Sequence, residues 1–280
     1  MGKLYQSAEL MQDAHKRGYG IPAYDTFNFE STKMVFEAAE RANTPVIIMM
    51  YLGIDMPIDS FAEMVKSLGA KAKVPYALHL DHSPSFEACM MAIKAGFTSV
   101  MIDASKKPID ENVAETRKVV EAAHAMGIDV EGELGMVGRN EAVNRSMFTQ
   151  PEEAVSFIER TGIDTLAVAI GNSHGMYIEE PELDIPLLES INKVAGKPLV
   201  LHGTSMIPVD QLKEAVRHGI CKTNIATEYM MYYKQKVAEL AASDKCPGTI
   251  TGILSGVQGA VTDFIYEKMR VLNPDDVKIL

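Results

Sequence analysis

The chain has 280 residues, of which 47% are hydrophobic, and this length and composition predict one large core and a single domain over residues 1–280. Its net charge of −11, without any cluster of Lys and Arg, argues against a nucleic-acid partner, because phosphate backbones bind to basic surfaces. Neither a Cys-x-x-Cys pair nor an apolar segment of bilayer-spanning length occurs, so we expect a reduced, cytoplasmic protein that does not contact membranes.

Short apolar runs alternate along the chain with stretches of helical periodicity, which is the pattern of repeated βα units. Eight strands are expected, over residues 20–25, 45–50, 76–81, 98–103, 128–133, 164–170, 198–202 and 220–224. Eight regular units predict an α/β fold of the closed (β/α)8 TIM-barrel type, since an open doubly wound sheet typically has fewer strands and a Gly-x-Gly-x-x-Gly turn. We also expect an N-terminal helix over 4–16 that caps the bottom of the barrel, and an extra C-terminal helix over 253–269.

Local signals mark where the helices between these strands begin and end. Four glycines stand between a helical stretch and the next strand, where a left-handed residue would end the helix: Gly96, Gly127, Gly162 and Gly219. The spacing of Thr149 and Glu152 predicts a capping box, with Pro151 in the first helical turn. The segment 134–148 before that helix is long for a compact barrel, and segments of this length are often lids over sites.

Three of the apolar runs lead into a histidine. His82 follows Asp81 after the third run, His174 follows the sixth, and His202 ends the seventh. A barrel of parallel strands brings its strand ends together, and three imidazoles with an open fourth position form a catalytic zinc site. Taken alone, the Asp81–His82 pair is equally consistent with a helix cap followed by a loop residue. The two further histidines favour a metal held by all three imidazoles.

Acidic residues occupy the same strand ends. We expect Asp81 to face the substrate as a general acid/base, because adjacent side chains on a strand diverge and His82 can then face the metal. Asp103 and Glu133 end the fourth and fifth strands, where they would orient the metal ligands or form a transient second metal position. Glu141 lies in the long segment and would be a solvated charge, unless that segment closes and lets it transfer a proton.

The loops after the seventh and eighth strands predict a phosphate site. They read Gly203-Thr204-Ser205 and Asn224-Ile225-Ala226-Thr227, with small residues, hydroxyls and backbone amides that lead into helices. Oriented N–H groups attract a phosphate dianion without any net charge, although ordinary helix caps have a similar composition. Because His202 abuts the first loop, a phosphorylated substrate that also contacts the metal is favoured.

Six short motifs occur in order across nearly the whole chain. They are His79-Leu80-Asp81-His82, Met101-Ile102-Asp103, Glu131-Gly132-Glu133-Leu134-Gly135, Gly171-Asn172-Ser173-His174-Gly175, Leu201-His202-Gly203-Thr204-Ser205 and Asn224-Ile225-Ala226-Thr227. Together they closely resemble the class II, zinc-dependent ketose-bisphosphate aldolases of the fructose- and tagatose-bisphosphate type. The resemblance implies an aldehyde-lyase that reversibly cleaves a ketose 1,6-bisphosphate or ketose 1-phosphate to dihydroxyacetone phosphate and an aldehyde such as glyceraldehyde 3-phosphate. It also implies a role in glycolysis or related carbohydrate metabolism, and we expect a homodimer or homotetramer.

The resemblance assigns roles to individual positions. Asp81 matches the family's acid/base at the C4 hydroxyl, and Glu141 matches a mobile-loop glutamate that moves the C3 proton. Positions that bind the dihydroxyacetone phosphate moiety match Gly175, Gly203, Ser205, Asn224 and Thr227. The glycine-containing loops after the sixth and seventh strands also resemble a monovalent-cation site, which implies Na⁺ or K⁺ beside zinc.

The resemblance weakens at the positions that contact the distal end of the substrate. The chain has Tyr24-Asp25 where family members usually show Phe-Asn, and Ala104-Ser105-Lys106 where they show Gly-Ser-His. Pro247-Gly248 stands in place of a Pro-Arg pair whose arginine reaches the distal phosphate, and the usual Gly-Gly-x-Glu-Asp-Gly loop is altered from Gly138 to Val143. We therefore hypothesise an aldehyde product other than glyceraldehyde 3-phosphate, with a different distal group that meets Arg139, Arg145 or Lys106.

Three other functions remain as alternatives. A class I aldolase would need a lysine nucleophile, for which Lys222 in the eighth strand is the obvious candidate, but the three histidines would then have no role. A zinc-dependent sugar-phosphate isomerase or epimerase would use the metal and Asp81 without cleaving a carbon–carbon bond. A non-catalytic sugar-phosphate binder would tolerate the loss of Asp81.

Overall fold

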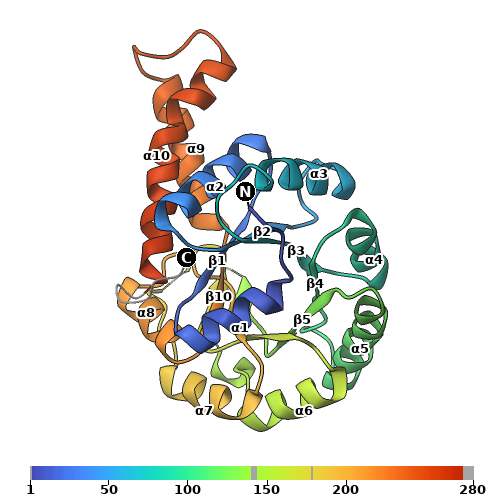
Figure 1. Ribbon diagram of the computed structural model, residues 1–280. Helices are drawn as coiled ribbons and strands as arrows, with labels where there is room; N and C mark the ends of the chain where they lie inside the picture. The colour runs from blue at the N-terminus through green and yellow to red at the C-terminus, as the bar shows by residue number, and fades with distance from the viewer. Residues whose placement is uncertain (1, 140–143, 178, 274–280) are drawn as a thin grey trace.

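Parallel strands close into a barrel in the computed structural model, which describes residues 2–139, 144–177 and 179–273 (Figure 1). Hydrogen-bonded neighbours follow the order β1-β10-β9-β7-β5-β4-β3-β2 around the closed sheet. The barrel strands are β1 (Ile21–Asp25), β2 (Val46–Met50), β3 (Tyr76–Ser83), β4 (Ser99–Ile102), β5 (Asp129–Leu134), β7 (Thr165–Val168), β9 (Leu199–Leu201) and β10 (Ile220–Ile225), while β6 (Gly138–Arg139) and β8 (Ser173–His174) pair outside it. Each barrel strand falls on an expected run, so the predicted (β/α)8 barrel is confirmed.

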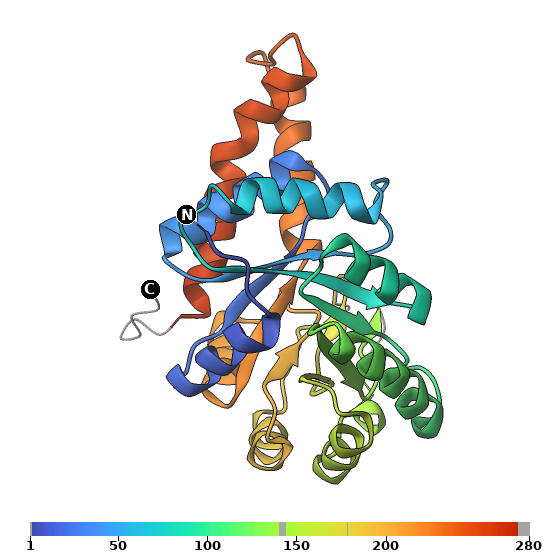
Figure 2. The same ribbon diagram turned by 45° about the vertical axis from the view of Figure 1, so that its right-hand side comes forward.

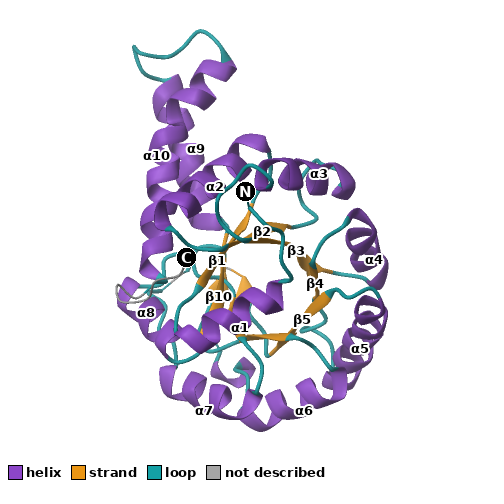
Figure 3. Ribbon diagram, in the orientation of Figure 1, coloured by secondary structure: helices purple, strands orange, loops and turns teal. Residues whose placement is uncertain are grey.

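A ring of helices surrounds these strands, drawn in purple in Figure 3. Between successive barrel strands the chain forms α2 (Phe29–Ala42), α3 (Ile58–Gly69), α4 (Phe86–Ala95), α5 (Ile109–Ala125), α6 (Pro151–Thr161), α7 (Ile185–Ala195) and α8 (Val209–Arg217). Gly96 and Gly162 end their helices in the left-handed conformation, as predicted, and their N–H groups bond back to the preceding turn. Gly127 and Gly219 also have positive φ, each one residue beyond the cap of its helix.

The expected capping box at Thr149 does not form. Helix α6 begins at Pro151, which lies in the first turn as predicted, but its N-cap Gln150 makes no side-chain hydrogen bond to the helix. The Thr149 hydroxyl instead donates to the carbonyl of Leu134 and accepts from the N–H of Ala169, which is 2.9 Å away. Thr149 thus joins the ends of β5 and β7, and this cross-strand interaction replaces the local cap.

Alternate residues of the strands face two different cores. In β1, Ala23 belongs to a cluster inside the barrel, whereas Tyr24 belongs to the larger core between the strands and the helices. Helix α1 (Ser7–Arg17) adds Leu10 and Met11 to the interior cluster, and Figure 1 shows it crossing one open end of the barrel. It is the expected N-terminal cap, and it leaves the carboxyl ends of the strands open for a site.

Two C-terminal helices extend beyond the ring of helices (Figures 1 and 2). Helix α9 (Thr227–Ala241) follows β10, and α10 (Ile250–Val271) packs against α9 and against α2. Helix α10 is the expected extra C-terminal helix, which begins and ends slightly outside the predicted range of 253–269. Within the described part of the chain, no helix combines the length and the apolar character needed to cross a membrane.

Candidate active site

The carboxyl ends of the barrel strands surround a cavity of about 430 Å³, at the end of the barrel opposite α1. It is lined by the ends of β1, β3, β8 and β10, by the loops after β2 and β9, and by the first turn of α9. The structure brings most of the predicted site residues to this one place: Asp81, His82, His174, Gly175, His202, Gly203, Ser205, Asn224, Ala226 and Thr227. Segments as far apart in sequence as β3 and α9 therefore share one cavity.

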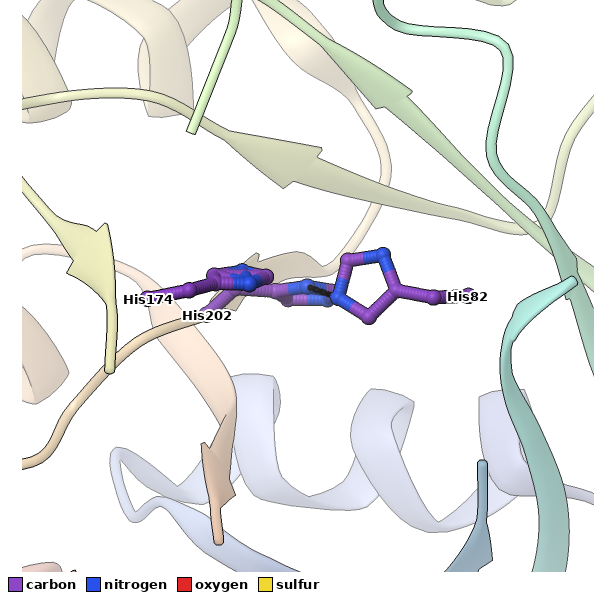
Figure 4. Close-up of side chains that lie close together, drawn as sticks. All are labelled: His82, His174 and His202. Carbon is purple, nitrogen blue, oxygen red and sulfur yellow. Dashed lines mark hydrogen bonds between the residues drawn. The ribbon is translucent and has the colours of Figure 1, made fainter. Parts of the chain in front are cut away.

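Three imidazoles converge in this cavity (Figure 4). The ring centroid of His82 lies 4.6 Å from that of His174 and 4.7 Å from that of His202, and Nε2 of His82 lies 2.9 Å from Nδ1 of His202. One nitrogen atom of each ring lies within 4.8 Å of the other two. Tetrahedral zinc with bonds of about 2.0–2.1 Å holds its nitrogen ligands roughly 3.4 Å apart. Small side-chain rotations would therefore fit these three imidazoles to a zinc ion.

A break in the register of β3 brings Asp81 and His82 to the same cavity. The pairing of β3 with β4 shifts between Leu80 and Ser83, and His82 has a φ of 42°, in the left-handed region. Such a backbone costs on the order of 1–3 kcal/mol in a residue other than glycine, and it recurs at functional sites. Nε2 of His82 lies 3.9 Å from Oδ2 of Asp81. The side chains of Asp81 and His82 therefore diverge less than strict strand alternation would require.

The short β6–β8 pair and a close approach of two loops hold His174. The Tyr177 hydroxyl accepts from the N–H of Ser173 and donates to the carbonyl of Gly203, each over 2.7 Å. Gly203 has a φ of 61°, and a Cβ there would lie 2.2 Å from the carbonyl oxygen of Ser173. Only glycine allows this approach of the loop after β9 to β8. The sequence did not predict the β6–β8 pair, because strands of two residues show no periodicity.

His202 is anchored from the interior of the barrel. Its Nε2 atom lies 2.9 Å from Oε1 of Glu131, and Nζ of Lys222 lies 2.8 Å from Oε2 of the same carboxylate. Burial alone would raise the pKa of Glu131, but Lys222 and His79 hold it well below its usual range. An ionised carboxylate therefore fixes the His202 imidazole so that Nδ1 faces His82.

Asp103 and Glu133 lie behind His82. Oδ2 of Asp103 lies 2.9 Å from Nδ1 of His82, and the other oxygen accepts from the N–H and the hydroxyl of Ser105 over 3.2 and 2.7 Å. Burial raises the pKa of Glu133, whose Oε2 lies 3.6 Å from Nδ1 of His202. His82, Asp103 and Glu133 also have ligand atoms within 4.8 Å of one another. Their placement is compatible with both expected roles, orientation of the imidazole and a second metal position.

Asp81 is buried beside the imidazoles. Its Oδ1 atom accepts from Nδ2 of Asn224 over 2.9 Å. Burial alone would raise the pKa of Asp81, but the imidazoles of His82 and His202 lower it below its usual range. The pKa of Asp25 is instead raised well above its usual range, by burial and by Asp81. The pair therefore favours an ionised Asp81 next to a protonated Asp25.

The loops after β9 and β10 meet at the N-terminus of α9. The N-cap Ala226 makes no side-chain hydrogen bond to the helix, and the Ser205 hydroxyl accepts from the N–H of Glu228 over 3.2 Å. Thr204 and Ile225 do not line the cavity, because the Thr204 hydroxyl donates to a backbone carbonyl and Ile225 belongs to the core. The helix end leaves backbone N–H groups that attract an anion.

Other predicted residues lie elsewhere. Glu141 and the side chain of Arg139 are outside the part of the chain that the structure describes. Arg145 pairs with Asp184 over 3.4 Å and is 77% exposed, and Lys106 is exposed. Neither Arg145 nor Lys106 lines the cavity, so the hypothesis that one of them meets a distal group there is not supported.

Sequence reasoning missed Glu131 and Tyr51 as members of the site, and it named Asp25 only as a position where the family resemblance weakens. Glu131 lies two positions before Glu133 in β5, so strand alternation already indicated that both face the barrel interior. Asp25 is an acidic residue at the end of its strand, as Asp103 was expected to be, and this position also indicated a place at the barrel mouth. Tyr51 carried none, because an aromatic residue after a buried strand is typical of a core.

Comparisons with known proteins agree with this geometry. A family model described as "Fructose-bisphosphate aldolase class-II" matches residues 5–276. A probable fructose-bisphosphate aldolase of Bacillus subtilis (strain 168) is 39% identical over 275 residues, which cover 95% of this chain and 96% of that protein. A fructose-bisphosphate aldolase of Staphylococcus aureus (strain Mu50) is 40% identical over 250 residues, covering 86% of this chain and 87% of the relative.

Solved structures show the same architecture. The YdjI aldolase from Escherichia coli K12 has a TM-score of 0.89 and 34% sequence identity, covering 98% of this chain and 99% of that one. A putative fructose-1,6-bisphosphate aldolase from Coccidioides immitis has a TM-score of 0.85 and 28% identity, covering 95% and 96%. These similarities extend over nearly the whole chain.

Proposed function

The chain belongs to the class II fructose-bisphosphate aldolase family and is an aldehyde-lyase of carbohydrate metabolism, and on this premise we propose that it reversibly cleaves a ketose 1-phosphate or ketose 1,6-bisphosphate. The products are dihydroxyacetone phosphate and an aldehyde. One observation carries the proposal: three imidazoles and the Asp81 carboxylate meet at the barrel mouth beside the N-terminus of α9.

A zinc ion would be held by His82, His174 and His202. Asp103 and Glu131 occupy the nitrogens of His82 and His202 that point away from the shared centre, which leaves Nε2 and Nδ1 directed at it. Zinc bound there would act as a Lewis acid that polarises the C2 carbonyl of the ketose.

The electrostatics of the cavity support a divalent cation. Burial alone would lower the pKa of His82, but the carboxylates of Asp81 and Asp103 raise it to about 10. This upward shift in pKa indicates a strongly negative electrostatic potential at the imidazole. Such a potential stabilises a positive charge placed there. A bound divalent cation supplies that charge in place of the proton.

Asp81 acts as the general base in cleavage. Its lowered pKa keeps it ionised at neutral pH, and Asn224 holds one of its oxygens while the other remains available to the substrate. Asp81 removes the proton of the C4 hydroxyl, and the electron pair of the O–H bond forms the aldehyde carbonyl as the C3–C4 bond breaks. The electron pair of the C3–C4 bond remains with C3, which then takes up a proton to give dihydroxyacetone phosphate. In condensation, Asp81 returns this proton to the new hydroxyl.

The phosphate of dihydroxyacetone phosphate binds at the N-terminus of α9. Oriented N–H groups at this helix end and the Ser205 hydroxyl are donors of the kind a phosphate dianion takes. The residues proposed to bind this moiety are Gly175, Gly203, Thr204, Ser205, Asn224, Ile225, Ala226 and Thr227, with Thr204 and Ile225 contributing backbone groups alone.

Two further parts of the proposal come from the family resemblance. Glu141 transfers the proton at C3 of dihydroxyacetone phosphate. A monovalent cation, Na⁺ or K⁺, binds at the loops of Gly175 and Gly203, which lie next to the Ser173 carbonyl oxygen, a backbone oxygen of the kind that such a cation binds.

We also propose that the protein forms a homodimer or homotetramer in the cytoplasm. Apolar side chains are exposed on the α9–α10 arm, including Met231 at 48% and Ile250 at 64%, and a second subunit would cover them. Light scattering coupled to gel filtration measures the assembly directly.

Release of triose phosphate tests this function. Fructose and tagatose 1-phosphates and 1,6-bisphosphates are incubated with the zinc-loaded enzyme, and dihydroxyacetone phosphate is detected by coupled reduction. Exchange of a C3 proton of dihydroxyacetone phosphate for deuterium is measured separately, because it needs no aldehyde. Interconversion of the sugar phosphates without triose phosphate release would identify an isomerase or epimerase instead.

A further inference from the structure

The lining of the cavity is uneven in charge. The N-terminus of α9 and the Ser205 hydroxyl attract an anion. Asp25 and Tyr51 also line the cavity, and Asp25 interacts with the carboxylate of Asp81. Among the described residues that line the cavity there is no Lys or Arg. The described lining therefore offers one anion site, at the N-terminus of α9.

The nearby ammonium groups that the structure describes are engaged elsewhere. Lys222 is fully buried and pairs with Glu131 over 2.8 Å inside the barrel. Lys268 pairs with Glu228 over 2.9 Å at the start of α9. A second phosphate placed beside Asp25 would therefore lose its hydration and face carboxyl groups without a cation among the described lining residues.

Asp25 carries a buried carboxyl group that lines the cavity. The residue is 6% exposed, its carboxyl group shares a hydrogen bond with Asp81, and its Oδ1 atom is buried without a hydrogen bond to any other described residue. The Tyr51 phenol lies close enough for Asp25 to raise its pKa, in addition to the effect of burial. An alcohol hydroxyl of a ligand in the cavity would satisfy this oxygen, because it can donate a hydrogen bond without adding charge.

We infer that Asp25, Tyr51, Leu52 and Met230 form a distal subsite that binds the aldehyde half of the substrate as an uncharged polyhydroxy chain. The Asp25 carboxyl accepts a hydrogen bond from a hydroxyl of this chain, and Leu52 and Met230 contact its carbon skeleton. This inference rests on the proposed function, which places the phosphate of dihydroxyacetone phosphate at the N-terminus of α9. The preferred substrate is accordingly a ketose 1-phosphate and not a ketose 1,6-bisphosphate.

A matched pair of substrates tests the distal subsite. Values of kcat/KM for dihydroxyacetone phosphate release are compared between fructose 1-phosphate and fructose 1,6-bisphosphate, and between the two tagatose esters. For whichever sugar is cleaved faster, fructose or tagatose, the kcat/KM of the 1-phosphate should be at least ten times that of the bisphosphate. Equal or faster cleavage of the bisphosphate overturns the inference. Deuterium exchange at C3 of dihydroxyacetone phosphate does not involve the distal end, so its failure would instead remove the proposed function.

Two variants connect this preference to Asp25. Asp25→Asn keeps the shape of the side chain but removes the carboxyl group, and it should reduce the ratio of 1-phosphate to bisphosphate kcat/KM at least fivefold. Asp55→Asn removes an exposed carboxylate of the segment after β2, which also carries Tyr51 but whose Asp55 does not line the cavity, and it should leave the ratio unchanged. A ratio that Asp25→Asn leaves intact, or that Asp55→Asn changes equally, contradicts the assignment. Deuterium exchange in each variant verifies that the site is folded.

Discussion

Oε1 of Glu131 lies 2.9 Å from Nε2 of His202, although β7 separates their two strands in the barrel. The same carboxylate pairs with Lys222 in the barrel interior. This buried ion pair therefore contacts the His202 ring, whose other nitrogen, Nδ1, faces the proposed metal. The orientation of His202 therefore depends on charges in the core and not on the conformation of a surface loop.

Glu131→Gln should weaken zinc binding about 10- to 100-fold, the usual effect of removing a carboxylate behind a metal-bound imidazole. The neutral amide orients the His202 ring less strongly and raises its basicity less than a carboxylate does. Competition with a chromogenic chelator measures the affinity. Because Lys222 would be left as an unpaired buried charge, the double variant Glu131→Gln, Lys222→Met separates weaker metal binding from loss of stability. Zinc affinity equal to wild type in both variants would contradict the role of Glu131.

Asp81→Asn should lower kcat for ketose phosphate cleavage about 10²- to 10⁴-fold, the range for loss of a general base. The amide keeps the size of the side chain but cannot take up the C4 hydroxyl proton. Zinc content, measured by atomic emission, should stay near wild type. Asp110→Asn is the matched control, because its side chain is 81% exposed on the barrel surface. Cleavage at the wild-type rate by Asp81→Asn would point to a binding protein or to a different base.

The barrel and the convergence of its strand ends could be predicted from the sequence. Runs such as 76–81 and 198–202 alternate with helical stretches, and parallel strands necessarily place Asp81 and His202 at the same end. Strand alternation also suffices to place Glu131 on the same face of β5 as Glu133. These features follow from local periodicity and topology alone.

The remaining features depend on contacts that no local pattern encodes. The positive φ of His82 results from a register shift between β3 and β4, and the Thr149 hydroxyl bonds to neighbouring strand ends in place of its own helix. The pKa of Asp25 is raised because the fold buries its carboxyl group and places Asp81 beside it. Tertiary interactions of this kind override local signals, and they concentrate at the barrel mouth where the site lies.

Chelation should abolish cleavage, and zinc should restore it. Treatment with borohydride in the presence of substrate should not inactivate the enzyme, because no Schiff base is formed. Lys222 is fully buried and paired with Glu131, so its amine cannot serve as the nucleophile of a class I mechanism. Activity that survives exhaustive chelation, or an enzyme trapped by borohydride, would exclude the metal-dependent reaction.

Gly203→Ala should destabilise the protein by more than 2 kcal/mol, as an order of magnitude, and weaken zinc binding. A Cβ at this position would meet the carbonyl oxygen of Ser173 at 2.2 Å and would displace the loops that carry His174 and His202. Gly127→Ala is the control, because Gly127 has a similar φ of 69° and nothing within 4 Å of an added Cβ. It should cost about 1 kcal/mol and leave zinc affinity unchanged. Equal effects of the two variants in chemical denaturation would show that Gly203 contributes backbone conformation alone.

The free energy of unfolding should decrease as the pH rises from 4 to 6, in part because of Asp129. Its carboxylate accepts from the N–H of Ala8 over 2.7 Å, and burial raises its pKa from 3.8 to about 6. Between these values the folded state binds more protons than the unfolded state, so the free energy of unfolding decreases as the pH rises. Asp129→Asn keeps an acceptor for Ala8 and removes the ionisation. The variant should match wild type below pH 4 and exceed it by about 1–2 kcal/mol at pH 7.5, a figure reduced for partial exposure. Urea unfolding across this range measures the difference, and parallel profiles would assign the pH dependence to other groups.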